Sequence, residues 1–166
     1  MKNVPFGLLA LCLCHVVGAA YGADPSVDTK PRALFNGADL SGWQGDSRFW
    51  KVQDGAIVGQ TSADNPAPHN TFLSYVDDEF ADFELTFKYK VDGFNSGMQY
   101  RSVQHDDFKV SGYQADFEAQ WHDGGVDKFT GMFFEEGGRM FMGQRGDVVL
   151  VNEASEKSGK PTINKV

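Results

Sequence analysis

Cysteine, basic residues and helical periodicity are all scarce in this sequence of 166 residues. The only cysteines, Cys12 and Cys14, lie in an apolar N-terminal run. If that run is removed, the mature chain has no thiol, which excludes disulfides and cysteine metal sites. Leu11 and Leu13 stand where a bacterial lipoprotein needs a small residue before its cysteine, so we do not expect lipid attachment.

The N-terminus has the order of regions that is typical of a secretory leader. Lys2 supplies the positive region, residues 6–20 (FGLLALCLCHVVGAA) the apolar region, and residues 20–22 (AYG) a small-x-small cleavage site. The apolar run is short for a membrane span, and no other stretch is long enough for one. We therefore expect a signal peptide at 1–22, a linker at 23–32, and one secreted or periplasmic domain at 33–166.

Positive charge is in short supply, with 15 Lys and Arg against 23 Asp and Glu, a formal net charge of -8. Loss of Lys2 with the leader takes this to -8 minus 1, or -9. An acidic chain without basic clusters is a poor partner for nucleic acid or an anionic membrane. Neutral sugars or cations suit it better.

Short runs of alternating apolar and polar residues fill the rest of the chain. Residues 49–60 (FWKVQDGAIVGQ) predict a hairpin that turns at Asp54-Gly55. The clearest strand is 82–91, which places one apolar set on one face: Phe83, Leu85, Phe87, Tyr89 and Val91. Further strands are expected at 70–75, 96–102, 112–118, 131–136, 139–143 and 147–151, and none in the tail from 152. Many short strands without helices predict an all-β antiparallel jelly-roll sandwich.

One predicted strand, 112–118 (GYQADFE), carries an amide and two carboxylates on one face, namely Gln114, Asp116 and Glu118. If it pairs with the strand at 96–102, Gln99 and Arg101 extend this polar row. Arg101 beside Asp116 would keep that carboxylate ionised and oriented. The row is therefore either a sugar site on a concave sheet or an ordinary solvated face with a surface ion pair.

Each of the remaining candidate site residues can also be explained by a structural role alone. Residues 95–97 (NSG) are common in turns. Aromatic residues stack on sugars but also fill cores; we expect Trp43 and Trp50 in the core and leave Trp121 open. The histidines, among them His122, lack zinc-site spacing, and the acidic loops lack the order of a calcium loop. A serine elbow, a phosphate loop and a dinucleotide fingerprint are all missing.

Several segments together resemble the 3-keto-disaccharide hydrolase family: 34–43 (LFNGADLSGW), 49–60, 70–75, 80–90, 95–102 (NSGMQYRS), 110–117 (VSGYQADF) and 130–139 (TGMFFEEGGR). The resemblance ends near Met142. It implies a concanavalin-like jelly roll that acts on glucosides already oxidised at C3. The family continues with a Trp-Asn segment and a closing strand, so we expect a domain that is incomplete at its C-terminal end.

The resemblance implies elimination followed by hydration. A C3 ketone acidifies the C2 proton, a base removes it, and the C1 substituent leaves before water adds. Asp116 or Glu118 is a sensible base, Arg101 or a carboxylate-bound divalent cation the electrophile at O3, and Glu135 or His122 the acid. Further candidates for contact with a glycoside or oligosaccharide are Asn95, Gln99, Tyr113, Gln114, Trp121 and His122.

Two other functions fit parts of this pattern. A retaining glycosidase on a related jelly roll would need an ionisable residue where Gln114 stands, so its carboxylate pair is broken. A non-catalytic carbohydrate-binding module would keep the polar face and the aromatic residues without needing a base.

Overall fold

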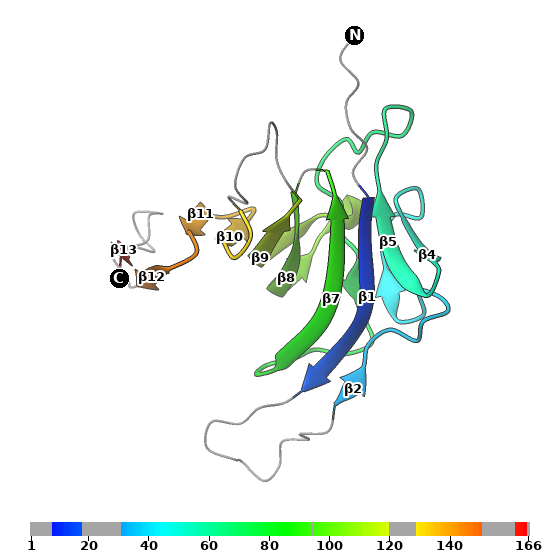
Figure 1. The fold of residues 1–166 in the computed structure, drawn as a ribbon, viewed down its shortest axis with the longest axis horizontal. Helices are drawn as coiled ribbons and strands as arrows, with labels where there is room; N and C mark the ends of the chain where they lie inside the picture. The colour runs from blue at the N-terminus through cyan, green and yellow to red at the C-terminus, as the bar shows by residue number, and fades with distance from the viewer. Residues whose placement is uncertain (1–7, 18–30, 94, 120–128, 151–161, 166) are drawn as a thin grey trace. The chain divides into compact units, whose positions relative to one another are not determined.

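The computed structural model describes residues 8–17, 31–93, 95–119, 129–150 and 162–165 (Figure 1). Within these ranges the chain is all-β, with antiparallel sheets, no closed barrel and no α-helix. The exception is a single 3-10 turn at Asp106–Phe108. This confirms the all-β fold of jelly-roll type that the alternating sequence pattern predicts. The chain divides into two compact units, Met1–Lys90 and Val91–Val166.

The first unit is built on one antiparallel sheet in the order β2-β1-β5-β4, with β7 also paired to β1. Its strands are β1 (Leu8–Val17), β2 (Arg32–Ala33), β4 (Trp50–Gln53), β5 (Ala56–Gln60) and β7 (Glu84–Asp92), whose last two residues belong to the second unit. A second, two-stranded sheet pairs β3 (Trp43–Gln44) with β6 (Ser74–Tyr75). The side chains buried in this unit are Leu34, Phe35, Phe49, Ile57 and Val58.

The predicted hairpin at Asp54-Gly55 is confirmed. Gln53 pairs with Ala56, so a two-residue turn joins β4 to β5. Asp54 has φ 52° and Gly55 has φ 73°, which are the two positive angles that a type I′ turn requires. Asp and Gly adopt these angles at low cost, so the local sequence accounts for this turn.

Residues 8–17, from the predicted leader, form strand β1. This strand pairs with β5 through Leu8–Leu11 and with β2 through His15 and Val16, and β7 lies along its other side (Figure 1). The same apolar sequence therefore fits a strand inside a sheet as well as a leader. The leader at 1–22 stays a prediction.

Strand β7 keeps the predicted alternation but buries less than we expected. Leu85, Phe87 and Val91 are half-buried, and Tyr89 is 44% exposed. Trp43 and Trp50 are half-buried too, and the Trp43 indole donates a hydrogen bond to the Leu34 carbonyl at 2.8 Å. The prediction that this face of β7 is buried in a core was therefore wrong: its residues are at most half-buried, and Tyr89 is exposed.

The second unit contains a four-stranded antiparallel sheet in the order β11-β10-β9-β8. Its strands are β8 (Asn95–Gln104), β9 (Val110–Glu118), β10 (Phe133–Glu136) and β11 (Met140–Gly143). Its buried apolar side chains are Val110, Phe117, Met132 and Met142. Two carboxylates, Asp116 and Glu118, are buried as well.

The second unit also contains a two-stranded sheet, formed by the last strands in the sequence. Strand β12 (Asp147–Leu150) pairs with β13 (Thr162–Lys165). The tail beyond residue 151 was expected to form no strand, and that expectation was wrong at 162–165. Thr162 and Ile163 are β-branched, a preference of strands, but four residues are too few to stand out in a polar tail.

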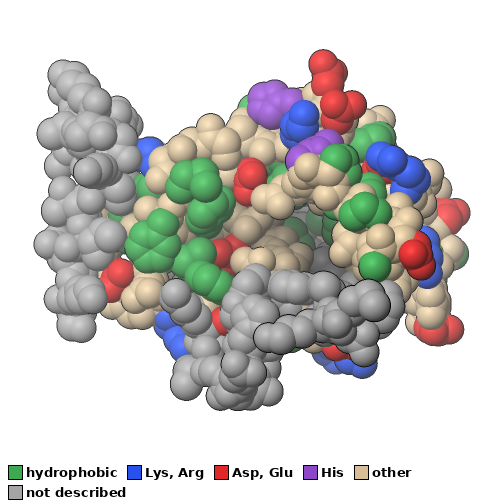
Figure 2. Space-filling view, turned by 90° about the horizontal axis from the view of Figure 1, so that it is seen from above, with side chains coloured by type: hydrophobic (Ala, Val, Ile, Leu, Met, Phe, Trp, Pro, Cys, Tyr) green, Lys and Arg blue, Asp and Glu red, His purple; other side chains and the backbone are tan. Residues whose placement is uncertain are grey.

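On the face drawn in Figure 2, Lys and Arg side chains are scattered among acidic ones and form no basic patch. Within the described ranges no helix reaches the length and hydropathy that crossing a membrane needs.

Candidate active site

The polar row predicted on residues 112–118 lies on β9, which pairs with β8 as expected. In this register Asn95 faces Glu118, Gly97 faces Asp116, and Gln99 faces Gln114. Directly opposed residues of antiparallel strands point to the same side of a sheet. The Gln99 amide donates to the Gln114 Oε1 at 2.8 Å, and the Gln114 amide in turn donates to the Asp116 Oδ1. The predicted row is therefore one connected polar face.

The residues 95–97 (NSG) belong to strand β8 and do not form the turn that composition favoured. Gly97 lets the Gln114 side chain of the neighbouring strand pack closely against the backbone of β8. A Cβ placed on it would overlap the Gln114 side chain and lie 2.9 Å from its Nε2. The missing side chain at Gly97 thus makes room for the Gln114 amide beside Asp116.

Asp116 is the most distinctive group on this face. Its residue is 4% exposed. Burial raises the pKa of Asp116 from 3.8 to about 6, the Gln114 hydrogen bond opposes this rise, and the charges of Glu136 and Glu118 add to it. A carboxylate with this pKa is ionised at neutral pH yet basic enough to accept a proton, which suits a general base.

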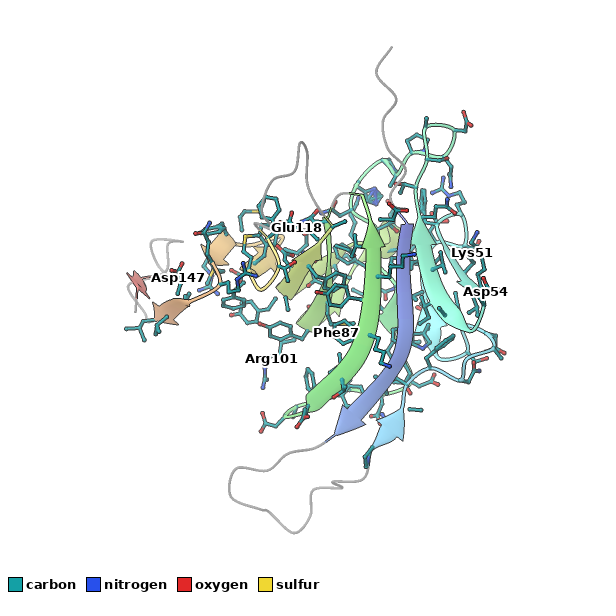
Figure 3. All side chains as sticks on the ribbon, in the orientation of Figure 1. Lys51, Asp54, Phe87, Arg101, Glu118 and Asp147 are labelled. Carbon is teal, nitrogen blue, oxygen red and sulfur yellow. The ribbon has the colours of Figure 1, made fainter. Side chains whose placement is uncertain are left out.

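Arg101 does not play the part that the sequence predicted. The ladder is interrupted by a bulge between Tyr100 and Val103, and Arg101 lies in it with φ 49°. Its side chain is exposed and projects away from the strands in Figure 3. Arg101 is not among the groups that shift the pKa of Asp116, and that pKa rises where an adjacent arginine would lower it. The expected Arg101–Asp116 pairing was wrong because the bulge breaks the alternation.

Glu118 forms hydrogen bonds to a neighbouring segment of the chain. Its Oε1 accepts a hydrogen bond from the backbone N–H of Phe129 at 2.6 Å, and its own N–H donates to Thr130 Oγ1 at 3.0 Å. These two hydrogen bonds connect the end of β9 to Phe129 and Thr130. Between the two candidate bases, the structure thus favours Asp116 over Glu118.

Glu135 and Glu136 point to opposite faces of the sheet, as alternation predicts. Glu135, which the sequence analysis chose as a candidate acid, points away from the face that carries Asp116. Glu135 lies opposite Tyr113, and Glu136 lies opposite Gly112. Since Gly112 shares its face with Gln114 and Asp116, so does Glu136. Its charge raises the pKa of Asp116. Glu135, the acid expected from the sequence, therefore lies on the face away from Asp116, and Glu136 lies on the Asp116 face.

Glu135 is instead held by Arg139, a residue that the sequence analysis did not single out. The Arg139 Nε donates to Glu135 Oε2, and its Nη2 donates to Glu135 Oε1 at 3.2 Å and to the Tyr113 hydroxyl at 3.0 Å. This hydrogen bonding lowers the pKa of Glu135. The segment 135–139 (EEGGR) signals the pair, since Gly138 has no side chain to collide with the Glu135 carboxylate.

Tyr113, a predicted sugar contact, lies on the same face as Glu135. Its ring centroid is 5.1 Å from that of Phe133 and 6.0 Å from that of Tyr100. Tyr113 is therefore part of an aromatic cluster on the side of the sheet away from Asp116. Trp121 and His122, also predicted contacts, lie outside the described residues.

The described ranges contain no cluster of three or more His, Cys, Asp and Glu side chains that could hold a metal ion. The carboxylates of this face are spread along β9 and β10 and alternate with amides, and the Glu118 Oε1 is already bonded to Phe129. These residues do not fit a divalent cation, so no step below passes through one.

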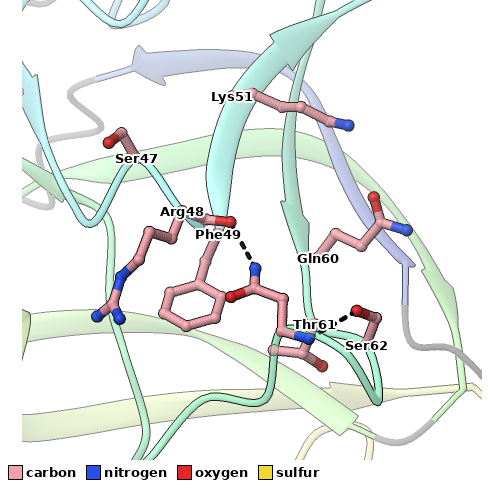
Figure 4. A pocket seen from close by; sticks show the side chains of 8 residues that line it. Ser47, Arg48, Phe49, Lys51, Gln60, Thr61 and Ser62 are labelled. Carbon is pink, nitrogen blue, oxygen red and sulfur yellow. Dashed lines mark hydrogen bonds between the residues drawn. The ribbon is translucent and has the colours of Figure 1, made fainter.

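A polar pocket lies in the first unit, away from the predicted residues. Its lining comes from the start of β4 and the end of β5, and includes Arg48, Lys51 and Gln60 (Figure 4). Asn65 closes one side by donating from its Nδ2 to the Arg48 carbonyl at 2.8 Å. No predicted site residue lines this pocket.

Comparison with known families gives one match. The model of the 3-keto-alpha-glucoside-1,2-lyase-like domain matches residues 30–164, which is most of the chain and extends past Met142, where the sequence motifs ended. No curated protein and no solved structure matches the chain. The matched range contains β8, β9 and β10, and with them the whole Asp116 face. The chain therefore belongs to the family of 3-keto-alpha-glucoside-1,2-lyase-like domains.

Proposed function

We propose that this protein cleaves 3-keto-glucosides by β-elimination followed by hydration, with Asp116 as the base. The observation that carries the proposal is the buried Asp116 carboxylate, whose pKa is raised to about 6. The family supports the class of substrate, a sugar with a ketone at C3.

In the first step the Asp116 carboxylate takes the proton from C2. The C3 ketone makes that proton acidic, because the electron pair left on C2 spreads onto O3 as an enolate. The enolate collapses back to the ketone, a C1–C2 double bond forms, and the C1–O bond breaks. The departing oxygen takes up a proton. In the second step water adds its oxygen to C1 and a proton returns to C2, so the net reaction is hydrolysis.

Two neighbours of Asp116 are suited to assist the reaction. Asn95 is exposed at the start of β8, diagonal to Asp116 on the same face, and its amide is a donor for the developing charge on O3. Glu136 lies on this face from β10, and its negative charge makes Asp116 a stronger base by raising its pKa. Since Asp116 ionises near pH 6, activity is expected to rise with pH through that value.

The test is incubation of the protein with 3-keto-trehalose and, separately, with trehalose. We expect turnover of the ketone sugar alone, because only the ketone acidifies the C2 proton, and loss of that turnover in Asp116→Asn. Asp106→Asn, at an exposed aspartate of the 3-10 turn, is the matched control. Turnover of plain trehalose would instead indicate a classical glycosidase. Binding of either sugar without turnover would indicate a binding module.

A further inference from the structure

Three polar side chains form a hydrogen-bonded line that ends on Asp116. Ser102 Oγ lies 3.0 Å from Gln99 Oε1, the Gln99 Nε2 donates to Gln114 Oε1 at 2.8 Å, and the Gln114 Nε2 donates to Asp116 Oδ1. The line crosses from β8 to β9 between two directly opposed residues. Asp116 is therefore joined to the rest of the face through a single amide, that of Gln114.

The direction of this line follows from its charged end. An ionised carboxylate can only accept, so Gln114 must turn its NH₂ toward Asp116 and its oxygen toward Gln99. Gln99 must then present its NH₂ to Gln114, which leaves its own oxygen for the Ser102 hydroxyl. Each amide is thus held in one orientation. Oδ1 of Asp116 accepts the Gln114 hydrogen bond, and Oδ2 accepts none from the side chains that the structure describes.

The groups around Asp116 are uncharged or negatively charged, so the Gln114 amide is important for stabilising its ionised form. Strand β8 presents the uncharged residues Asn95, Gly97 and Gln99. Strands β9 and β10 present Glu118 and Glu136, and both disfavour the ionised carboxylate. Of the groups that act on Asp116, Gln114 is the one that favours its charged form.

We propose that Gln114 is a positioning residue, which holds the Asp116 carboxylate in its ionised form and directs its free oxygen toward the C2 proton of the substrate. The amide does not touch the reacting atoms; it acts through Asp116. This inference rests on the proposed function only where it names the C2 proton. It also explains the amide at a position where a retaining glycosidase would need an acid, because a third carboxylate beside Asp116 would suppress its ionisation.

The test compares the wild-type protein with Gln114→Met, which keeps the length of the side chain and removes the hydrogen bond. Gln104→Ala, at an exposed glutamine of the same sheet, is the control. Loss of a hydrogen bond to a charged group shifts its titration midpoint by about 1–2 pH units. We expect the Asp116 carboxyl signal, followed by ¹³C NMR, to titrate at higher pH in Gln114→Met and at the wild-type pH in Gln104→Ala.

The same variants are assayed with 3-keto-trehalose across a range of pH. If the midpoint rises by 1 pH unit, Gln114→Met retains about one-fifth of wild-type kcat at pH 6 and recovers above pH 8. An unchanged titration of Asp116 in Gln114→Met overturns the positioning role, whatever the activity. If the wild-type protein turns over no 3-keto-glucoside, the proposed function fails, and the NMR titration still decides whether Gln114 controls Asp116.

Discussion

Gly97 of β8 lies directly opposite Asp116 of β9, and the side chain of Gln114 occupies the space that a residue larger than glycine would fill. The glycine thus has a role on the candidate site although it has no functional group. It allows the amide that bonds Asp116 to lie across the neighbouring strand.

Gly97→Ala should therefore harm activity more than stability. Its Cβ would displace the Gln114 side chain, which is flexible, so we expect a loss of about 1 kcal/mol in the free energy of unfolding. The hydrogen bond to Asp116 would be lost at the same time, and kcat at pH 6 should fall several-fold. Ser96→Ala, one residue away on the opposite face, is the control for both measurements. A Gly97→Ala protein with wild-type kcat at pH 6 contradicts the packing argument.

Asp116→Asn should stabilise the fold at neutral pH. The folded pKa of Asp116, about 6, lies above its ordinary value of 3.8, so the charged form is disfavoured by folding. The resulting penalty is absent below pH 3.8, grows as pH rises, and levels off above pH 6. Its full size is about 3 kcal/mol. Urea unfolding of both proteins at pH 4.5 and pH 7.5 should show a larger gain for Asp116→Asn at pH 7.5. An equal gain at both pH values would mean that Asp116 titrates normally.

Glu135→Gln and Glu136→Gln should have opposite effects. Glu135 is paired with Arg139, with side chains 20% and 14% exposed, so Glu135→Gln should cost about 1–3 kcal/mol of stability. Because the pKa of Glu135 is lowered from 4.5, its contribution is present above that pH and is lost as pH falls. Glu136→Gln should instead reduce turnover with little change in melting temperature. The reverse pattern would show that Glu135, and not Glu136, acts at the site.

Phe87→Ala should cost less than a buried core phenylalanine would. The side chain is half-buried on β7, so we expect a loss of about 2 kcal/mol instead of the 3–5 kcal/mol of a fully buried ring. Lys88→Ala, the exposed neighbour on the other face, should change stability by less than about 0.5 kcal/mol. Equal losses in both variants, measured by urea unfolding, would show that β7 has no core face.

Export should remove residues 1–22, since the charged, apolar and small-residue regions of a leader occur in order. N-terminal sequencing of exported protein should begin at residue 23, and a sequence that begins at Met1 would disprove the leader. Cleavage would also take away β1, which lies between β5 and β7 in the first unit. We therefore expect the purified 23–166 chain to melt at a lower temperature than the 1–166 chain.

Local sequence was enough to predict one hairpin turn and the polar face of one strand. The Asp54-Gly55 pair determined a hairpin, because few other residues adopt two positive φ angles. Strict alternation in 112–118 placed Gln114, Asp116 and Glu118 on one face, because successive side chains of a strand point to opposite sides. The connection at 103–111 is short enough to make pairing of this strand with β8 plausible, and the two strands do pair.

Only the tertiary structure determined which residues share the face of the sheet that carries Asp116. The bulge after Tyr100 moved Arg101 off the face, and alternation along a single strand cannot show where a ladder is interrupted. The register of β9 against β10 put Glu136, and not Glu135, on the same face as Asp116, because a shift of one residue exchanges the two faces. The raised pKa of Asp116 was also beyond the sequence, since it depends on how much water the folded chain excludes from that carboxylate.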